Sequence, residues 1–354
     1  MALVSLPGIQ EKYGYPHCVG HRSTLAGQIF DGCEQNKSIR FHFSHSVTAI
    51  KSFKPKAVID IQPRNGETYT IEVDILLAAD GIKSVIRPEI LRELQYDADV
   101  VDTGQAAYRI SLTREEMQHD PELLALIDKD AVTRWIGEKK HMIAYPVSSK
   151  TVYNIATAHP DVNFAEAPTA TYTTKGSKDS MMSTFGDFCP LVHKMLDMVP
   201  DGEVCEWKLR VHHPLPTWVH GVAALVGDAA HPTLPHLNQG AAQAIEDAGV
   251  LSVALAKLPD TSSESINKAL QVYERVRKRR AETLVDLAAL SGKTLMLGEG
   301  EAKKERDKMF AAISKDQKGS VPDKWADAEV QAMIYGHDCM QVTEDTFDEI
   351  FNSL

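Results

Sequence analysis

Long apolar runs, paired cysteines and a net positive charge are all missing from this 354-residue sequence. Its five cysteines are scattered and none belongs to a Cys-x-x-Cys pair, which argues against a disulfide framework and against a zinc knuckle. No apolar stretch approaches the roughly 20 residues that a membrane-spanning helix needs, so we expect no membrane span. The net charge of −11 argues against nucleic acid as a partner, because bulk attraction to phosphates requires a positive surface.

The remaining composition is typical of a globular protein, with 43% hydrophobic and 25% charged residues. A chain of this length holds two domains or one large interleaved domain. The N-terminus has no basic segment of the kind that begins a secretory signal, and the cysteine usage fits a reducing compartment, so we expect a cytoplasmic protein. Histidines, cysteines and carboxylates show no ligand spacing, and we predict no metal site.

The most informative stretch runs from Ala223 to Ala256. A short apolar strand at 223–226 leads into a glycine turn with a carboxylate, Gly227-Asp228, and a helix is predicted over 241–258. A helix N-terminus presents unpaired N–H groups and the positive end of its dipole, while the carboxylate can accept hydrogen bonds from sugar hydroxyls. This arrangement suits a phosphorylated or anionic heterocycle, although an ordinary strand–loop–helix connection contains similar glycines.

Two further stretches have a similar character. The apolar run Ile75–Ala79 has the pattern of a strand covered on both faces and ends in Asp80-Gly81, with helix-start residues Ser84 and Pro88 beyond. Near the N-terminus, His21-Arg22 precedes a predicted helix. Its predicted N-cap is Ser23, and its predicted apolar face consists of Leu25, Ile29 and Phe30.

Together these three stretches resemble the fingerprints of the class A FAD-dependent aromatic hydroxylases, the flavoprotein monooxygenases of the salicylate hydroxylase type. In that family the aspartate at the position of Asp228 binds the ribityl and pyrophosphate side of FAD, and the following loop faces the isoalloxazine ring. The segment at Asp80 serves both FAD and the nicotinamide coenzyme, and the arginine at Arg22 reaches the pyrophosphate. Asn238 stands where the family usually has glycine, and asparagine tolerates unusual backbone angles. The resemblance assigns cofactor binding to Arg22, Asp80, Gly81, Ser84, Arg87, Gly227, Asp228, Ala229, Pro232, Asn238, Gln239, Gly240 and Ala241.

The middle of the chain has a different pattern, with longer strands rich in aromatic and β-branched residues and a helical segment at 179–198. The resemblance places the substrate domain here, as a sheet that roofs the flavin. Arg109 on the first strand of this domain could orient an anionic aromatic substrate through charge-assisted hydrogen bonds, or it could simply lie over its own sheet as a surface side chain. The substrate-binding candidates are Tyr108, Arg109, Tyr145, Pro235 and His236; no catalytic residue is predicted.

The resemblance implies an α/β (α+β) fold, in which an incomplete Rossmann-like FAD-binding domain is interleaved with a mostly antiparallel β-sheet substrate domain and followed by a helical C-terminus. The predicted ranges are 1–99 and 213–297 for the FAD-binding domain, 100–212 for the substrate domain and 298–354 for the C-terminal region. Short strands are expected at 39–43, 47–53, 58–61 and 69–73, and helices over 241–258 and 264–297. The basic residues between Arg275 and Arg280 are expected to form a solvated face.

The Gly-x-Gly-x-x-Gly turn that holds the ADP half of FAD in this family does not occur in the sequence. Without the strand that leads into that turn, neighbouring strands such as Ile75–Ala79 would have exposed apolar sides and unpaired ladder groups. We expect a rearranged N-terminus, a second copy or another polypeptide to cover this gap.

Three functional hypotheses follow. The first is a monooxygenase of secondary metabolism that uses FAD, NADPH or NADH, and O₂ to hydroxylate or epoxidise an aromatic or polyketide-like small molecule. The second is a descendant of the family that has lost flavin chemistry and performs a non-redox cyclisation or isomerisation; the missing turn and Asn238 motivate it. The third is one piece of a split or truncated enzyme.

Overall fold

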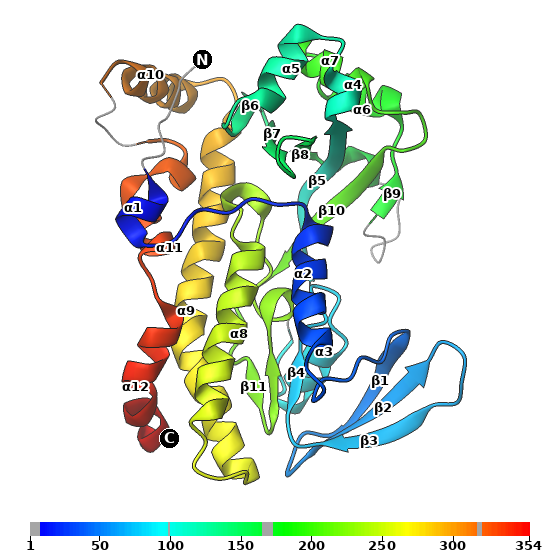
Figure 1. Ribbon diagram of the computed structural model, residues 1–354, viewed down its shortest axis with the longest axis vertical. Helices are drawn as coiled ribbons and strands as arrows, with labels where there is room; N and C mark the ends of the chain where they lie inside the picture. The colour runs from blue at the N-terminus through cyan, green and yellow to red at the C-terminus, as the bar shows by residue number, and fades with distance from the viewer. Residues whose placement is uncertain (1–7, 98–99, 165–172, 317–320) are drawn as a thin grey trace. The chain divides into compact units, whose positions relative to one another are not determined.

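A computed structural model describes residues 8–97, 100–164, 173–316 and 321–354 of the chain (Figure 1). The chain divides into two compact units. Unit 1 contains the described residues within Met1–Arg40, Asp102–Leu209 and Gly292–Asp327, and unit 2 those within Phe41–Val101, Arg210–Ser291 and Ala328–Leu354. This division falls at residue 40, inside the range 1–99 that the sequence predicted as one piece.

Unit 1 is built on a six-stranded sheet with the order β6-β7-β8-β5-β10-β9. The pairs β6/β7, β7/β8, β5/β8 and β9/β10 are antiparallel, as expected for the substrate domain. The strands are β5 (Val100–Thr113), β6 (Thr133–Gly137), β7 (Lys140–Val147), β8 (Val152–Pro160), β9 (Thr173–Lys175) and β10 (Cys205–His212).

One face of this sheet and the helices on it form the core of unit 1. Tyr108, Ile110 and Leu112 point to this face of β5, because alternate residues of a strand share a side. The predicted helical segment at 179–198 is two helices, since Pro190 cannot continue a helix and Cys189 before it is extended. The helices of unit 1 are α1 (Ile9–Tyr13), α2 (Arg22–Glu34), α4 (Arg114–Met117), α5 (Pro121–Asp128), α6 (Lys178–Thr184), α7 (Pro190–Asp197) and α10 (Glu301–Asp316), with 3₁₀ turns η1 (Val162–Phe164) and η4 (Lys324–Ala326).

Helix α2 differs from its prediction at both its cap and its face. Its N-cap is His21 rather than Ser23, and the His21 ring accepts a hydrogen bond from the Ser23 N–H. No residue of α2 is buried, and the predicted apolar face carries Leu25 and Ile29 in exposed positions. A histidine ring can cap the helix because Nδ1 is an acceptor in one tautomer.

Unit 2 contains two three-stranded sheets. The first is antiparallel, with the order β1 (His45–Ser52), β2 (Ala57–Pro63) and β3 (Tyr69–Val73). The second has the order β11 (Val219–His220), β12 (Ala223–Leu225) and β4 (Leu76–Ala78). The prediction of a strand at 39–43 is wrong, because these residues belong to no strand. Instead, the Phe41 and Phe43 rings stack with centroids 5.7 Å apart.

Strand β4 pairs with β12 in parallel and lies at the edge of its sheet within the described structure. An edge position leaves backbone groups unpaired but does not decide whether the faces are covered; the prediction that both faces are covered is wrong at Leu77. Ala78 is buried, but the side chain of Leu77 is 43% exposed. An apolar residue on an unpaired edge is unusual, because such edges promote association with other strands.

Helices α8 and α9 run side by side in unit 2 (Figure 1), and their buried residues pack with β12, Trp218 and Tyr273. Both long helices lie close to their predicted ranges. The helices of this unit are α3 (Ile86–Glu93), α8 (Gly240–Ala256), α9 (Ser263–Leu295), α11 (Ala328–Tyr335) and α12 (Cys339–Ser353), with 3₁₀ turns η2 (Gly227–Ala229) and η3 (Pro235–Leu237). Among the helices that the structure describes, none has the length and apolar character to cross a membrane.

Candidate functional site

The Asp80-Gly81 turn lies between β4 and helix α3. The Asp80 carboxylate accepts a hydrogen bond from the Val85 N–H at 2.8 Å, and Gly81 adopts a φ of +77°. The Ser84 hydroxyl accepts a hydrogen bond from the Arg87 N–H at 2.9 Å. Asp80 and Ser84 therefore satisfy backbone donors that the first turn of a helix leaves unpaired.

Arg87 joins the two predicted cofactor motifs of unit 2. Its side chain is buried, and its guanidinium donates to the carbonyl of Ile82 at 2.8 Å and to that of Ala229 at 3.2 Å. The structure does not support a direct contact between Arg87 and a cofactor, because the group is enclosed between the two loops. Its position instead links the Asp80 turn with the Gly227–Pro232 segment.

The turn after β12 requires glycine at its first position. Gly227 has a φ of +60°, and a Cβ atom there would lie 3.2 Å from the Cβ of Ala244 on α8. Its carbonyl accepts hydrogen bonds from the N–H groups of Ala230 and His231, which closes the turn. Ala229 and Pro232 are buried, whereas Asp228 is exposed. The carboxylate of the motif thus lies at the protein surface.

Asn238 adopts the left-handed conformation, with φ 54° and ψ 31°, at the end of η3. The asparagine therefore supplies the backbone conformation that glycine usually provides, as its chemistry allows. Helix α8 begins two residues later at Gly240, followed by the exposed Ala241, and its N-cap Gln239 makes no side-chain capping bond. The first N–H groups of α8 have no capping side chain and lie next to the Asn238 turn, which fits an electron-rich or anionic group.

A buried network of charges contacts the turn at Gly227–His231. Asp247 on α8 is fully buried and accepts hydrogen bonds from the Gly227 N–H at 2.9 Å, from His231 Nε2 at 2.7 Å and from Arg277 Nε at 2.8 Å. Burial acts to raise the pKa of Asp247, but the bonds and charges of His231 and Arg277 outweigh it, and the pKa is lowered. The carboxylate is therefore ionised at neutral pH.

The prediction of a solvated basic face on α9 is wrong for two of its residues. Arg277 is fully buried and also pairs with Glu246 and with the Gln243 side chain. Arg280 pairs with Glu246 at 2.8 Å and donates to the carbonyl of Met333, near the end of α11. The adjacent acids at 246–247 in an otherwise apolar helix were the available signal for this network, since buried carboxylates need basic partners.

Four further candidates, Arg22, Tyr108, Arg109 and Tyr145, lie in unit 1, and the two on β5 do not share one face. Tyr108 is buried in the core and stacks on the His159 ring with centroids 4.3 Å apart. Arg109 points to the opposite, exposed side of β5. Arg109 keeps an exposed surface but is partly desolvated by the protein around it, which lowers its pKa; the charge of Arg22 acts in the same direction and Tyr145 opposes it. Arg22, Arg109 and Tyr145 are therefore electrostatic neighbours, whereas the structure does not support Tyr108 as a substrate contact.

The last two substrate candidates lie in η3. His236 is only 1% exposed, so the structure does not present its side chain to a small molecule. Pro235 is partly exposed in the same turn. η3 therefore contributes backbone groups and the Pro235 ring to the surface of the loop before α8, whereas the His236 side chain lies inside.

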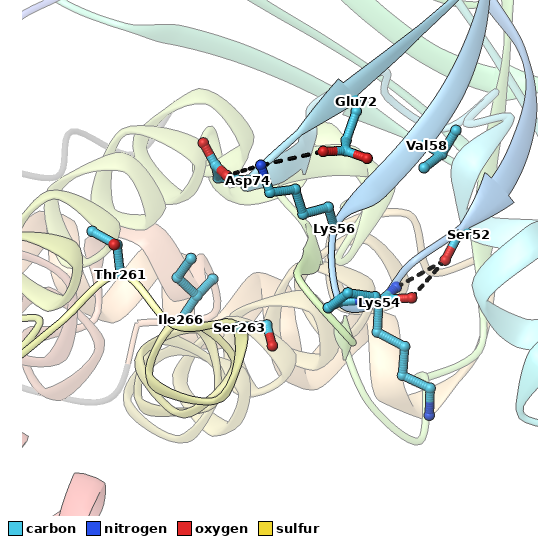
Figure 2. Close-up of a pocket in the computed structure, with 10 residues that line it drawn as sticks. Ser52, Lys54, Lys56, Val58, Glu72, Asp74, Thr261, Ser263 and Ile266 are labelled. Atoms are coloured by element: carbon cyan, nitrogen blue, oxygen red, sulfur yellow. Dashed lines mark hydrogen bonds and ion pairs between the residues drawn. The ribbon is translucent and has the colours of Figure 1, made fainter.

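A separate surface pocket of about 320 Å³ lies in unit 2 between the β1–β3 sheet and the start of α9 (Figure 2). On one wall Lys56 pairs with Glu72 at 3.2 Å and with Asp74 at 3.1 Å. Thr261 and Ser263 line the opposite side. None of the predicted cofactor or substrate residues lines this pocket, so it is distinct from the loops described above.

Comparison with known proteins agrees with these motifs. A family model described as FAD binding domain matches residues 25–288. The match extends over more than half of the chain and includes both motifs of unit 2. The chain therefore belongs to the FAD binding domain family, which confirms the resemblance found in the sequence.

Two relatives are FAD-dependent monooxygenases. The chain is 34% identical to ntnJ of Nectria sp., over 72% of this chain and 59% of that protein. It is 32% identical to atnJ of Arthrinium sp., over 68% of this chain and 55% of that protein. The chain thus spans between about half and two thirds of the length of these relatives.

A solved structure of salicylate hydroxylase in a substrate complex has the same fold. It aligns with a TM-score of 0.70 and 24% identity, over 90% of this chain and 74% of that one. The predicted fold class, a Rossmann-like domain combined with an antiparallel sheet, is confirmed.

Proposed function

We propose that this chain carries the flavin-facing part of an FAD-dependent monooxygenase that uses NADPH or NADH and O₂ on an aromatic or polyketide-like small molecule. The observation that carries the proposal is the loop at the start of α8. Here the exposed Asp228, the left-handed Asn238 and the N-terminus of α8, which has no capping side chain, lie on one continuous segment of unit 2. The names of the two monooxygenase relatives and of salicylate hydroxylase support the reaction class.

The chain's own residues would bind and orient the cofactor. FAD supplies the oxidative chemistry when it is bound. The Asp228 carboxylate would accept hydrogen bonds from ribityl hydroxyls, and the N–H groups at Gly240 and Ala241 would face electron-rich atoms of the flavin. In unit 1, the neighbouring Arg22 and Arg109 would supply positive charge for the pyrophosphate or for an anionic substrate.

An FAD titration of the purified chain tests this function. We expect visible flavin absorbance to be retained after removal of free FAD, and we expect Asp228→Ala to weaken binding at least tenfold, because a charge-assisted hydrogen bond contributes about 1.5–3 kcal/mol. Asp201→Ala changes another exposed aspartate, in a turn of unit 1, and should leave binding unchanged. A wild-type chain that takes up no FAD would refute the proposal for this polypeptide.

One of the two observations that motivated the non-redox alternative no longer supports it. Asn238 adopts the backbone conformation expected of glycine, so this departure from the family pattern gives no reason to expect loss of flavin binding. Turnover of a substrate without FAD or a nicotinamide coenzyme would nevertheless favour that alternative over the monooxygenase.

We further propose that another strand covers the edge of β4 that has no partner strand among the described residues. Leu76 donates to the Val222 carbonyl and Ala78 accepts from the Val226 N–H, so the peptide groups of Leu77 between them face the free edge. Together with the exposed Leu77 side chain, this edge suits a parallel strand of apolar residues. Native mass spectrometry of the protein from its source tests this. A dimer or a complex would identify a second copy or another polypeptide as the covering strand's source, whereas a lone monomer would leave only a segment of the same chain.

The predicted roles of the sequence ranges are part of the same proposal. The stretches 1–99 and 213–297 would serve the cofactor and 100–212 the substrate. We also propose a cytoplasmic location, which the scattered cysteines support.

A further inference from the structure

Asp247 holds both ends of the turn that carries the predicted cofactor carboxylate. A single oxygen, Oδ2, accepts hydrogen bonds from the Gly227 N–H at 2.9 Å and from His231 Nε2 at 2.7 Å. Asp228 lies between these two residues and is exposed, although its neighbours Gly227 and Ala229 are buried. The carboxylate below the turn therefore restrains the segment from which Asp228 projects.

From this geometry we propose that Asp247 is a positioning residue for the cofactor turn: it fixes Gly227 and His231 so that Asp228 is presented in one orientation. The inference rests on the proposed FAD-binding function, because Asp228 is the residue whose orientation it concerns. Asp247 itself is fully buried and touches no ligand from where it lies.

The charge of Asp247 is needed for this role. Its second oxygen, Oδ1, accepts from Arg277 Nε at 2.8 Å, so the carboxylate serves three donors with two oxygens. An asparagine has one oxygen and one NH₂ group, and in either orientation its NH₂ would face N–H donors. Asp247→Asn would therefore release either Arg277 or the turn.

Arg277 is held in place by partners other than Asp247, so it cannot move with Asp247 if that side chain shifts. Its Nη2 donates to the side-chain oxygen of Gln243 at 2.7 Å and to the Gln243 carbonyl at 3.2 Å, and it pairs with Glu246. Both of these partners lie on α8, as Asp247 does. Because a buried guanidinium requires a complete set of acceptors, its position also fixes that of Asp247.

The experiment compares Asp247→Asn with a matched carboxylate that does not touch the turn. Glu274 on α9 accepts from the Trp218 N–H at 2.9 Å and from the Thr217 hydroxyl at 2.8 Å, and Glu274→Gln perturbs that contact in the same unit. For each full-length variant we would measure FAD affinity by fluorescence quenching, the absorption spectrum at saturating FAD, urea unfolding, and amide exchange of the peptide covering residues 223–234.

We expect Asp247→Asn to raise the Kd for FAD at least tenfold, to shift the flavin absorption bands and to speed exchange of the turn, while Glu274→Gln leaves all three within twofold of wild type. Should Asp247→Asn fail to fold, His231→Gln keeps the Gly227 and Arg277 bonds and should raise the Kd three- to fivefold. An unchanged Kd in Asp247→Asn would overturn the inference. It would also be overturned if, in both variants, the change in Kd simply tracked the loss of stability measured in urea. If the wild type binds no FAD, the proposed function fails, and unchanged exchange in Asp247→Asn would separately refute restraint of the turn.

Discussion

Substituting Gly227 by alanine tests whether the cofactor turn is limited by backbone conformation, by space, or by both. The residue has a φ of +60°, and an added Cβ would lie 3.2 Å from the Cβ of Ala244. The left-handed conformation costs a residue with a Cβ about 1–2 kcal/mol. Overpacking against α8 adds about 1 kcal/mol, the low end for such substitutions, because only one contact is tight. We expect Gly227→Ala to lower the free energy of unfolding by about 2–3 kcal/mol.

Gly202→Ala is the control for the backbone contribution. Gly202 has a φ of +83° with nothing within 4 Å of an added Cβ, so this variant should lose only about 1–2 kcal/mol. The steric contribution is isolated by the double variant Gly227→Ala/Ala244→Gly. Ala244→Gly alone costs about 1 kcal/mol in a helix interior, but it removes the atom that the new Cβ meets. The double variant should therefore lose less than the sum of the two single losses, by about 1 kcal/mol.

Urea unfolding of the four variants measures these differences, provided that the denaturant slopes agree. Equal losses in Gly227→Ala and Gly202→Ala, together with strict additivity in the double variant, would show that α8 does not constrain the turn. A loss below about 0.5 kcal/mol in Gly227→Ala would refute the left-handed conformation itself.

Two further outcomes are expected in unit 1. Glu206 is fully buried and accepts from the buried His159 at 2.8 Å and from Asn163 at 2.9 Å. Asn163 is exposed and can bond to water instead, so Glu206→Ala leaves the His159 donor unsatisfied and should lower the unfolding free energy by about 1–3 kcal/mol. A loss below about 0.5 kcal/mol in urea unfolding would contradict this. Burial raises the pKa of Tyr108 to about 12, so the folded protein keeps a proton that the unfolded chain loses near pH 10, and stability should fall between about pH 10 and 12. Tyr108→Phe should reduce that fall, and identical alkaline stability profiles for variant and wild type would count against it.

Local patterns predicted most elements of this chain but not their surroundings. The strand at Tyr69–Val73 occurs over the predicted residues, and α8 and α9 begin within one residue of prediction. The sequence made both Tyr108 and Arg109 substrate candidates, although alternation along a strand puts neighbours on opposite faces and does not say which face is covered. The covered face is the one against which α5, α6 and α7 pack, and their apolar residues pack with Tyr108 in the core of unit 1.

Three features depended on segments far apart in the chain. Arg277 appeared solvated because its neighbours on α9 are charged, yet it lies against acids of α8 some 30 residues earlier. Arg87 matched a cofactor motif, yet it bonds a carbonyl 142 positions away. The apolar strand β4 looked covered on both faces, yet its Leu77 is 43% exposed.

The sequence by itself determined the conformation of the cofactor turn and the family to which the chain belongs. Gly227 and Asn238 specify left-handed positions because steric clashes within one or two residues decide φ and ψ. Tertiary structure alone decided which charges are buried and paired, as in Asp247 and Arg277. The physical reason is range: backbone sterics act between neighbours in the chain, whereas desolvation and ion pairing depend on whatever the fold brings alongside.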